Sequence, residues 1–368
     1  MHSCIFFGVL PFRVMEPREA RTIPSLDGLR AISIVLVLLG HGIGGAEGHS
    51  FLFRFALLHA DLGVRIFFVI SGFLITRLLI EEKERFGSIS LRLFYIRRAL
   101  RILPAFLAYV GVAFALSAFG VIEIPARLWI FVLTYTINFT QSVWQVGHLW
   151  SLSVEEHFYM LWPLAMRFAS LRACVWIAVT AIFGGVLVRG LFVTTGYELI
   201  NPQFRYATPL VLGPIAMGCL LAMAQDRVRR FIGAFPQWTG ATATAAGIGA
   251  LLAMDALDLG SANRILRMVM DLVLTGLLAR FVFVPGGLAG RVLNSAPLVF
   301  VGKLSYSLYL WQQLSMNPFG HAILNRFPWN LLVACAAGCA SWFVIETRFL
   351  RLRQRFRRVS LSPPAETC

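Results

Sequence analysis

Long apolar runs alternate along this chain with short loops that carry most of its arginines. An apolar run of about 20 residues is long enough for an α-helix to cross a lipid bilayer. Hydropathy predicts ten such helices, near residues 28–46, 61–80, 104–121, 149–168, 173–194, 208–224, 236–257, 265–284, 296–317 and 327–349. We therefore predict an all-α polytopic membrane protein with about ten transmembrane helices.

The segment 127–143 is also apolar, but threonine, asparagine and glutamine interrupt it. Charge decides its position, because cytoplasmic loops of membrane proteins collect lysine and arginine. If 127–143 does not cross, the basic loops at 81–103, 167–172 and 227–230 all fall on the same side as the basic N-terminal segment. We therefore predict a re-entrant or surface position for 127–143 and a cytoplasmic location for both termini.

These predictions divide the chain into three parts. A cytoplasmic N-terminal segment, 1–24, precedes one transmembrane domain, 25–350, and a basic cytoplasmic tail, 351–368, follows it. We expect a multi-pass protein of the cell (inner) membrane.

The composition agrees with this class of protein. Of the 368 residues, 58% are hydrophobic and 14% are charged, against about 45–50% and about 25% in soluble domains. A net charge of +15 would favour nucleic acid as the partner of a soluble protein. Here the basic residues cluster between apolar runs, so we expect contact with membrane lipids and no nucleic acid. Cys335 and Cys339 share a helix face, but no neighbouring histidine or acid completes a metal site, and we expect no metal.

The first apolar run places one cation and one imidazole on the same helix face. His41 follows Arg30 by eleven residues, a rotation of about 1,100° that ends about 20° past three full turns. The two side chains then stand about 16 Å apart along the axis, about half the thickness of the hydrocarbon core. One interpretation is an anchor arginine with a structural histidine. The other is a functional site, which is the default hypothesis for an ionisable group inside a membrane.

The run at 149–168 carries two adjacent acids, Glu155 and Glu156, which are costly to bury unless they are paired or protonated. Tyr159 lies one turn after Glu155 on the same face, and Trp150 and Ser151 lie about one turn before it. In the predicted topology, His41 and Glu155 reach similar depths from opposite chain directions.

Three arginines precede the third predicted helix. Arg97 and Arg98 lie four and three residues before Arg101, so their guanidiniums can converge on one side of a helix. Such a cluster suits the several phosphates of one ligand, because arginine binds phosphate oxygens bidentately. The alternative is a topogenic cluster that contacts anionic lipid headgroups.

Small and aromatic residues mark two further runs. Ser71 and Gly72 lie mid-span, where small side chains let a neighbouring backbone approach closely. Later in the chain, Tyr306, Tyr309 and Trp311 are candidates for lining a pocket, although an aromatic stripe more often serves packing. Ser305 lies one turn before Tyr309, and Lys303 lies near the cytoplasmic end of the same predicted helix. Among the remaining buried charges, Arg189 and Asp271 could form a structural ion pair.

These blocks resemble, in the same order, those of the acyltransferase-3 family of integral membrane O-acyltransferases. The matching stretches are Asp27-Gly-Leu-Arg30 with its spacing to His41, Phe67-Phe-x-x-Ser-Gly-Phe73, Arg97-Arg-x-x-Arg-x-x-Pro104, Trp150-Ser-Leu-x-x-Glu-x-x-Phe-Tyr159 and Ser305-Tyr-x-x-Tyr-Leu-x-Gln312. The chain departs from the family pattern at Gln312, where many members have histidine, so we assign no proton transfer there. The acid that the family retains falls on Glu155 rather than Glu156.

The resemblance implies transfer of an acetyl or other short acyl group from acyl-CoA, acetyl-CoA foremost, to a sugar hydroxyl of a surface polysaccharide or glycolipid. His41 would be the general base, because its unperturbed pKa lies near the working pH. Glu155 would orient the imidazole, and Arg30 would hold CoA phosphates or the negative charge on the thioester oxygen. An acyl-His41 relay is the less favoured route.

The same resemblance makes nine residues candidates for binding the donor or the acceptor: Arg97, Arg98, Arg101, Lys303, Tyr159, Ser305, Tyr306, Tyr309 and Trp150. Two other classes of function remain open. A transporter or flippase for a lipid-linked sugar or small anion would use the buried charges as a substrate path. A sensor or scaffold would leave the pattern of Arg30, His41 and Glu155 unexplained.

Overall fold

The computed structural model describes residues 23, 25–43, 51–234, 237–256, 264–317 and 323–356, and all of its described elements are helices. Most of the predicted N-terminal segment, the end of the predicted tail, and Cys4 and Cys368 lie outside the described residues. The longer helices are α1 (Leu26–Gly42), α2 (Phe51–Phe86), α3 (Leu91–Ala118), α6 (Leu149–Phe168), α7 (Leu171–Thr194), α10 (Gly213–Met223), α12 (Gln237–Ala256), α13 (Arg264–Phe283), α15 (Ala296–Ser315) and α16 (Trp329–Ser341).

Short helices connect these elements: α4 (Leu128–Leu133), η1 (Ile137–Phe139), α5 (Trp144–Gly147), α8 (Tyr197–Ile200), η2 (Pro202–Tyr206), α9 (Thr208–Val211), α11 (Gln225–Gly233), α14 (Gly287–Leu293), η3 (Ile323–Asn325), the π-helix η4 (Trp342–Glu346) and α17 (Thr347–Gln354). The predicted all-α class is confirmed. The segment 127–143 contains α4 and η1 but no helix of spanning length.

Within the described residues, four helices are long and apolar enough to cross a membrane: Ala60–Phe86, Leu91–Ala118, Leu171–Phe192 and Trp329–Gln354. A fifth candidate joins Leu266–Phe283 to Gly287–Leu293 through a bend of 88°. Three other predicted spans, 149–168, 236–257 and 296–317, contain helices of 20 residues (α6, α12 and α15) that do not meet the combined criteria of length, apolarity and low charge. The predicted span 208–224 is split between α9 and α10. Several membrane-crossing helices are thus supported, while the count of ten and the orientation of the termini stay predictions.

Local sequence signals set several helix ends. α2 ends at Phe86, and Gly87 follows with a φ of +71°, a conformation that glycine adopts without the strain a Cβ would add. Ser90 then caps α3 by accepting a hydrogen bond from the backbone N–H of Leu93 at 3.5 Å. The loop between α2 and α3 is therefore short and defined by its own residues.

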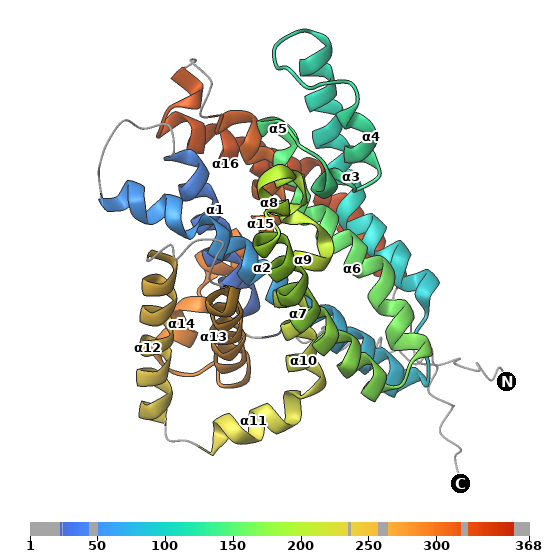
Figure 1. Cartoon of the computed structure of the whole chain (residues 1–368), viewed down its shortest axis with the longest axis vertical. Coiled ribbons are helices and arrows are strands. Elements are labelled where there is room, and N and C mark those ends of the chain that lie inside the picture. Colours follow the sequence, from blue (N-terminus) through green and yellow to red (C-terminus); the bar gives the residue numbers. More distant parts are fainter. Residues whose placement is uncertain are drawn as a thin grey trace, which may run out of the picture.

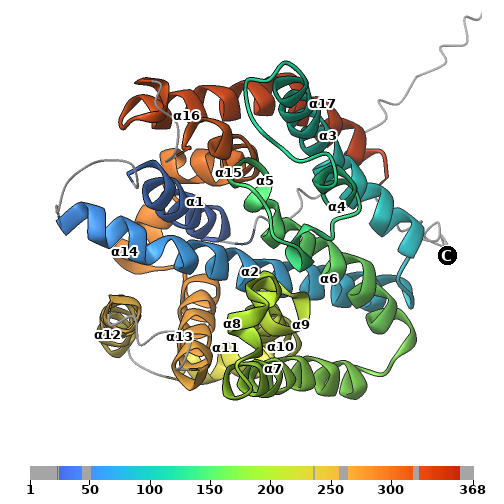
Figure 2. The ribbon, with the colours of Figure 1, turned by 45° about the horizontal axis from the view of Figure 1, so that its top comes forward.

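α2 runs through the middle of the bundle, between α1, α15 and α16 on one side and α7, α10 and α13 on the other (Figures 1 and 2). Its most extensive contacts are with α1 and α10, and α1 packs in turn on α15, which packs on α16. Residues of α2 consequently face most of the interior of the protein.

Two glycines allow α2 and α10 to cross closely. A Cβ on Gly72 of α2 would collide with the carbonyl of Ile215, and a Cβ on Gly218 of α10 would collide with the carbonyl of Val69. Each glycine therefore faces the backbone of the opposite helix, as the small residues at Ser71 and Gly72 led us to expect.

Gly72→Ala should destabilise the protein, because the added methyl group meets backbone atoms that cannot move away as a flexible side chain would. Overpacking of this kind costs about 1–3 kcal/mol. Gly111→Ala is the matched control, since nothing lies within 4 Å of a Cβ at that position of α3. Thermal unfolding of the detergent-solubilised variants measures both effects, and equal midpoints for the two variants would contradict the close crossing.

Candidate functional site

A small polar cavity, here called the Glu155 cavity, lies between α1, α2, α3, α6 and α15. Its volume is about 100 Å³, enough for several water molecules or a small chemical group. It brings together most of the residues predicted from the sequence: Arg30, Arg98, Arg101, Glu155, Tyr159, Ser305, Tyr306 and Tyr309. These residues come from four helices, so the fold brings together side chains that are distant in the sequence.

Glu155 is held by a chain of hydroxyl groups. Ser71 Oγ donates a hydrogen bond to Glu155 Oε1, and the Tyr159 hydroxyl donates to Ser71 Oγ at 3.0 Å. Both hydroxyl-bearing residues are buried, and hydrogen bonds are electrostatically stronger in such surroundings than in water. Ser71 thus binds the carboxylate as well as accommodating a neighbouring helix.

Three guanidiniums surround this cavity, and Glu155 is the one acid among its lining residues. Arg98 lies over the Tyr159 ring, 4.8 Å from its centroid. Arg30 forms an ion pair with Asp27 on its own helix at 3.8 Å. The cavity therefore favours a ligand group that carries or develops negative charge.

Arg97 does not line the cavity, although the sequence grouped it with Arg98 and Arg101. Its guanidinium donates to Glu82 Oε2 at 3.0 Å and to the carbonyl of Phe356 at 3.2 Å. Adjacent residues on a helix point in different directions, so Arg98 turns inward while Arg97 faces Glu82 of α2 and the backbone of Phe356, which follows α17.

Glu346, in the π-helix η4, is a site residue that the sequence did not reveal. It is 2% exposed, accepts a hydrogen bond from Ser307, and pairs with Arg101 at 3.8 Å. Arg101 lines the Glu155 cavity, so Glu346 positions one of its guanidiniums. A single acid near the end of the last apolar run gave no signal of this contact, which joins residues far apart in the chain.

His41 lies in an adjoining space, here called the His41 cavity, with a volume of about 450 Å³. Its Nδ1 is 3.0 Å from Gln312 Oε1, and its ring meets Trp144 edge-on with 5.5 Å between centroids. Because an amide oxygen accepts, this contact places the proton on Nδ1 and leaves the Nε2 lone pair to act as a base.

Val64 and Tyr309 line both cavities, so the two spaces share a wall. The Tyr309 hydroxyl donates to the carbonyl of His148 at 2.8 Å and lies 2.5 Å from Ser151 Oγ. No hydrogen bond joins His41 to Glu155 in the part of the chain that the structure describes. Gln312, rather than Glu155, is the hydrogen-bond partner of the imidazole.

Arg30 and His41 both belong to α1, as predicted, but they serve different spaces. Arg30 lines the Glu155 cavity, whereas His41 lines its own cavity three turns further along the helix. Trp150 lines the His41 cavity and stacks on Tyr206 with 4.2 Å between centroids. Lys303 is exposed and lines neither cavity.

A second histidine near this site, His148, lies two residues before the Trp150–Tyr159 motif and was not singled out from the sequence. It is 4% exposed and lines the His41 cavity, close to the rings of Tyr109 and Tyr309. Neither of its ring nitrogens has a hydrogen-bond partner among the described residues. It therefore adds a second imidazole to the space that holds His41.

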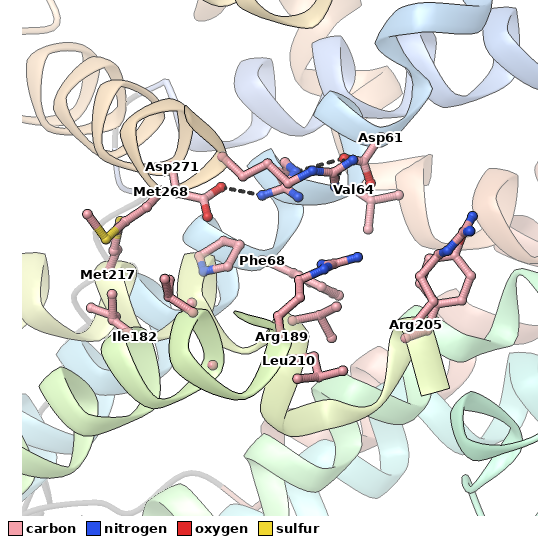
Figure 3. A pocket seen from close by; sticks show the side chains of 18 of the residues that line it. Asp61, Val64, Phe68, Ile182, Arg189, Arg205, Leu210, Met217, Met268 and Asp271 are labelled. Atoms are coloured by element: carbon pink, nitrogen blue, oxygen red, sulfur yellow. Dashed lines mark hydrogen bonds and ion pairs between the residues drawn. The ribbon is translucent and has the colours of Figure 1, made fainter. Parts of the chain in front are cut away.

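The sequence suggested an ion pair between Arg189 and Asp271, whereas the structure pairs Asp271 with Arg65. Asp271 Oδ1 accepts from Arg65 at 2.8 Å, and Arg65 also donates to Asp61 at 2.8 Å. Arg189 nevertheless lines the same third cavity as these residues (Figure 3). Arg65 was missed because it lies two residues before the Phe67–Phe73 stretch, whose aromatic and small residues carry the family resemblance.

Metal ligands do not gather within the described ranges: no three histidine, cysteine, aspartate or glutamate side chains there could hold an ion together. The four described cysteines, at positions 174, 219, 335 and 339, are free. The chemistry that the described residues offer is therefore that of a base, a hydrogen-bonded acid and several guanidiniums.

Comparison with known proteins gives a family match and several relatives. A family model described as an acyltransferase domain matches residues 23–347. A protein of Staphylococcus aureus strain COL named "Putative O-acetyltransferase" is 29% identical over 315 residues, covering 80% of this chain and 50% of that protein. O-acetyltransferase OatA of S. aureus strain NCTC 8325 is 28% identical over 326 residues, covering 81% and 51%. The chain thus spans about half the length of these relatives, and no solved structure gives a significant match.

Glu346→Ala should destabilise the protein, because it removes the carboxylate that pairs with the half-buried Arg101 guanidinium and accepts a hydrogen bond from the buried Ser307. Leaving a buried hydrogen-bonding group without its partner costs about 1–3 kcal/mol. Glu81→Ala is the control: Glu81 is 50% exposed in its pair with Arg77, and surface substitutions usually stay within about 0.5 kcal/mol. Thermal unfolding in detergent distinguishes them, and a midpoint for Glu346→Ala as high as that of the control would remove the assigned pairing.

Proposed function

Because the chain belongs to the acyltransferase-3 family, we propose that it is a membrane O-acyltransferase that moves an acetyl or other short acyl group from acyl-CoA to a carbohydrate hydroxyl. The acceptor would be a surface polysaccharide or a glycolipid. One observation carries the proposal: a cavity rich in guanidiniums and a cavity that holds a histidine base share a wall at Tyr309 and Val64. An acyl donor in the first and an alcohol in the second would meet there.

The size of the Glu155 cavity supports a short acyl group. At about 100 Å³, it accommodates the acetyl thioester end of the donor but not the whole of CoA. The phosphates of CoA would lie outside it, on the side where α3 carries Arg97 and α15 carries the exposed Lys303. With ten spans and both termini cytoplasmic, this side would face the cytoplasm of a cell whose inner membrane holds the protein.

The proposed reaction is direct transfer. The acceptor hydroxyl attacks the thioester carbonyl carbon while His41 Nε2 takes the hydroxyl proton, forming the new C–O bond. The negative charge on the carbonyl oxygen faces the guanidiniums of Arg30 and Arg98. As the C–S bond breaks, the CoA thiolate leaves and receives the proton from His41, which restores the neutral base.

Gln312 and Glu155 would have separate tasks in this reaction. Gln312 fixes the imidazole tautomer through its contact with Nδ1 and orients Nε2 toward the acceptor. Glu155, held by Ser71, lines the donor cavity together with Arg30 and Arg98 and would balance part of their positive charge. Tyr309 would separate the two reactants until both are bound.

His41→Ala should lower the release of CoA thiol from acetyl-CoA and an acceptor by at least about 10²-fold, the usual contribution of a general base. His157→Ala is the matched control, since His157 bonds Thr208 at 2.7 Å and lines neither cavity. Thiol release by the purified full chain measures both. If His41→Ala transfers the acyl group at the rate of the control, His41 is not the general base. If the wild type binds the acceptor but releases no thiol, the result favours a transporter over an acyltransferase.

Arg98→Gln should raise the KM for acetyl-CoA by about tenfold, because a charge-assisted hydrogen bond contributes about 1.5–3 kcal/mol. Arg92→Gln removes the same charge from an exposed position of the same helix and should leave this KM unchanged. Initial rates at varied acetyl-CoA concentrations provide the measurement. Equal KM values for the two variants would place the donor elsewhere.

A further inference from the structure

A third cavity, here called the arginine cavity, lies beside the His41 cavity and has a volume of about 400 Å³. Residues of α2, α6, α7, η2, α9, α10 and α13 enclose it (Figure 3). Six charged side chains line it: Asp61, Arg65, Arg189, Arg205, Arg267 and Asp271. Four guanidiniums therefore face two carboxylates.

Arg65 donates a hydrogen bond to each of the two carboxylates. Arg65 Nε donates to Asp61 Oδ2 and Arg65 Nη1 donates to Asp271 Oδ1, each at 2.8 Å. Arg267 adds a longer ion pair with Asp61, at 3.6 Å. Arg65 therefore ties α2 to α13. The two remaining arginines that line the cavity are Arg189 and Arg205.

Arg189 and Arg205 supply those two guanidiniums from different elements. Arg189, on α7, is 8% exposed, and its side chain reaches toward the centre of the cavity, while Arg205 of η2 lies at one edge (Figure 3). A guanidinium carries five N–H donors, so one that already has a partner still offers donors to a ligand. Its planar fork matches the oxygens of a carboxylate or a phosphate.

The arginine cavity and the His41 cavity share a wall. Asp61, Val64, Trp150 and Tyr206 line both spaces. Together the two cavities fall within the volume range of ligand sites, about 300–1,000 Å³. A molecule with an anionic group in the arginine cavity would therefore extend toward Nε2 of His41.

We propose that the arginine cavity binds an anionic group, a phosphate or a carboxylate, of the carbohydrate that receives the acyl group. This proposal rests on the proposed acyl transfer, because it assigns the contents of the His41 cavity to the acceptor. It narrows the acceptor to an acidic sugar such as a uronate or a sugar phosphate. The bound anion would fix which hydroxyl of the sugar reaches His41.

Calorimetric binding to the purified full chain, without acyl donor, tests this directly. The probes are glucuronate, glucose 1-phosphate, inorganic phosphate and glucose. At least one of the two acidic sugars should bind at least about tenfold more tightly than glucose, and the corresponding affinity should fall by about tenfold or more in Arg189→Gln and in Arg205→Gln. Arg205 is exposed, so its variant keeps the test valid if Arg189→Gln fails to fold.

Arg77→Gln is the matched control, because Arg77 pairs with Glu81 at the surface of α2 and lines none of the three cavities. It should bind the acidic sugars as the wild type does. Equal affinity for glucose and both acidic sugars would overturn the proposal, as would tighter binding of inorganic phosphate than of either acidic sugar. Loss of acetyl-CoA binding in Arg205→Gln would overturn it too, by assigning the cavity to the donor. Because no transfer is measured, these results are independent of whether the proposed acyltransferase activity is found.

Discussion

The close crossing of α2 with α1 and α10 is the constraint on which the rest of the structure depends. Val64, one turn along α2 from Asp61, lines all three cavities, and Ser71 of the same helix binds Glu155. The position of α2 therefore helps to define the walls of all three cavities. Gly72 and Gly218 make the close crossing with α10 possible, since each leaves room for the backbone of the other helix.

The second constraint is the cost of placing charge among apolar helices. Three acids of the described structure have specific partners: Glu346 pairs with Arg101, Asp271 with Arg65, and Glu155 accepts from Ser71. Buried charge is tolerated when it is paired and hydrogen-bonded. Each pairing also fixes the direction of a guanidinium or a carboxylate, so the contacts that make burial tolerable also shape the cavities.

Residues close together on one helix were predictable from the sequence. The spacing of Arg30 and His41 follows from helix geometry alone, as does the shared face of Glu155 and Tyr159. The apolar runs predicted a helical membrane protein, although one such run, 208–224, is divided in the structure into α9 and α10. Contacts between helices distant in sequence were not predictable: Gln312 reaches His41 across 271 positions, and Arg65 reaches Asp271 across 206. No local pattern encodes such pairs, because they depend on which helix faces which.

The central claim is that the acyl donor and the alcohol meet at the wall between the Glu155 and His41 cavities. The most direct measurement is a cryo-electron microscopy structure of the full chain with a non-reactive acetyl-CoA analogue and an acceptor sugar. The account predicts the acyl carbon beside Tyr309 and the acceptor hydroxyl within about 2.6–3.2 Å of His41 Nε2. An acceptor bound away from His41, or an acyl group outside the Glu155 cavity, would contradict it.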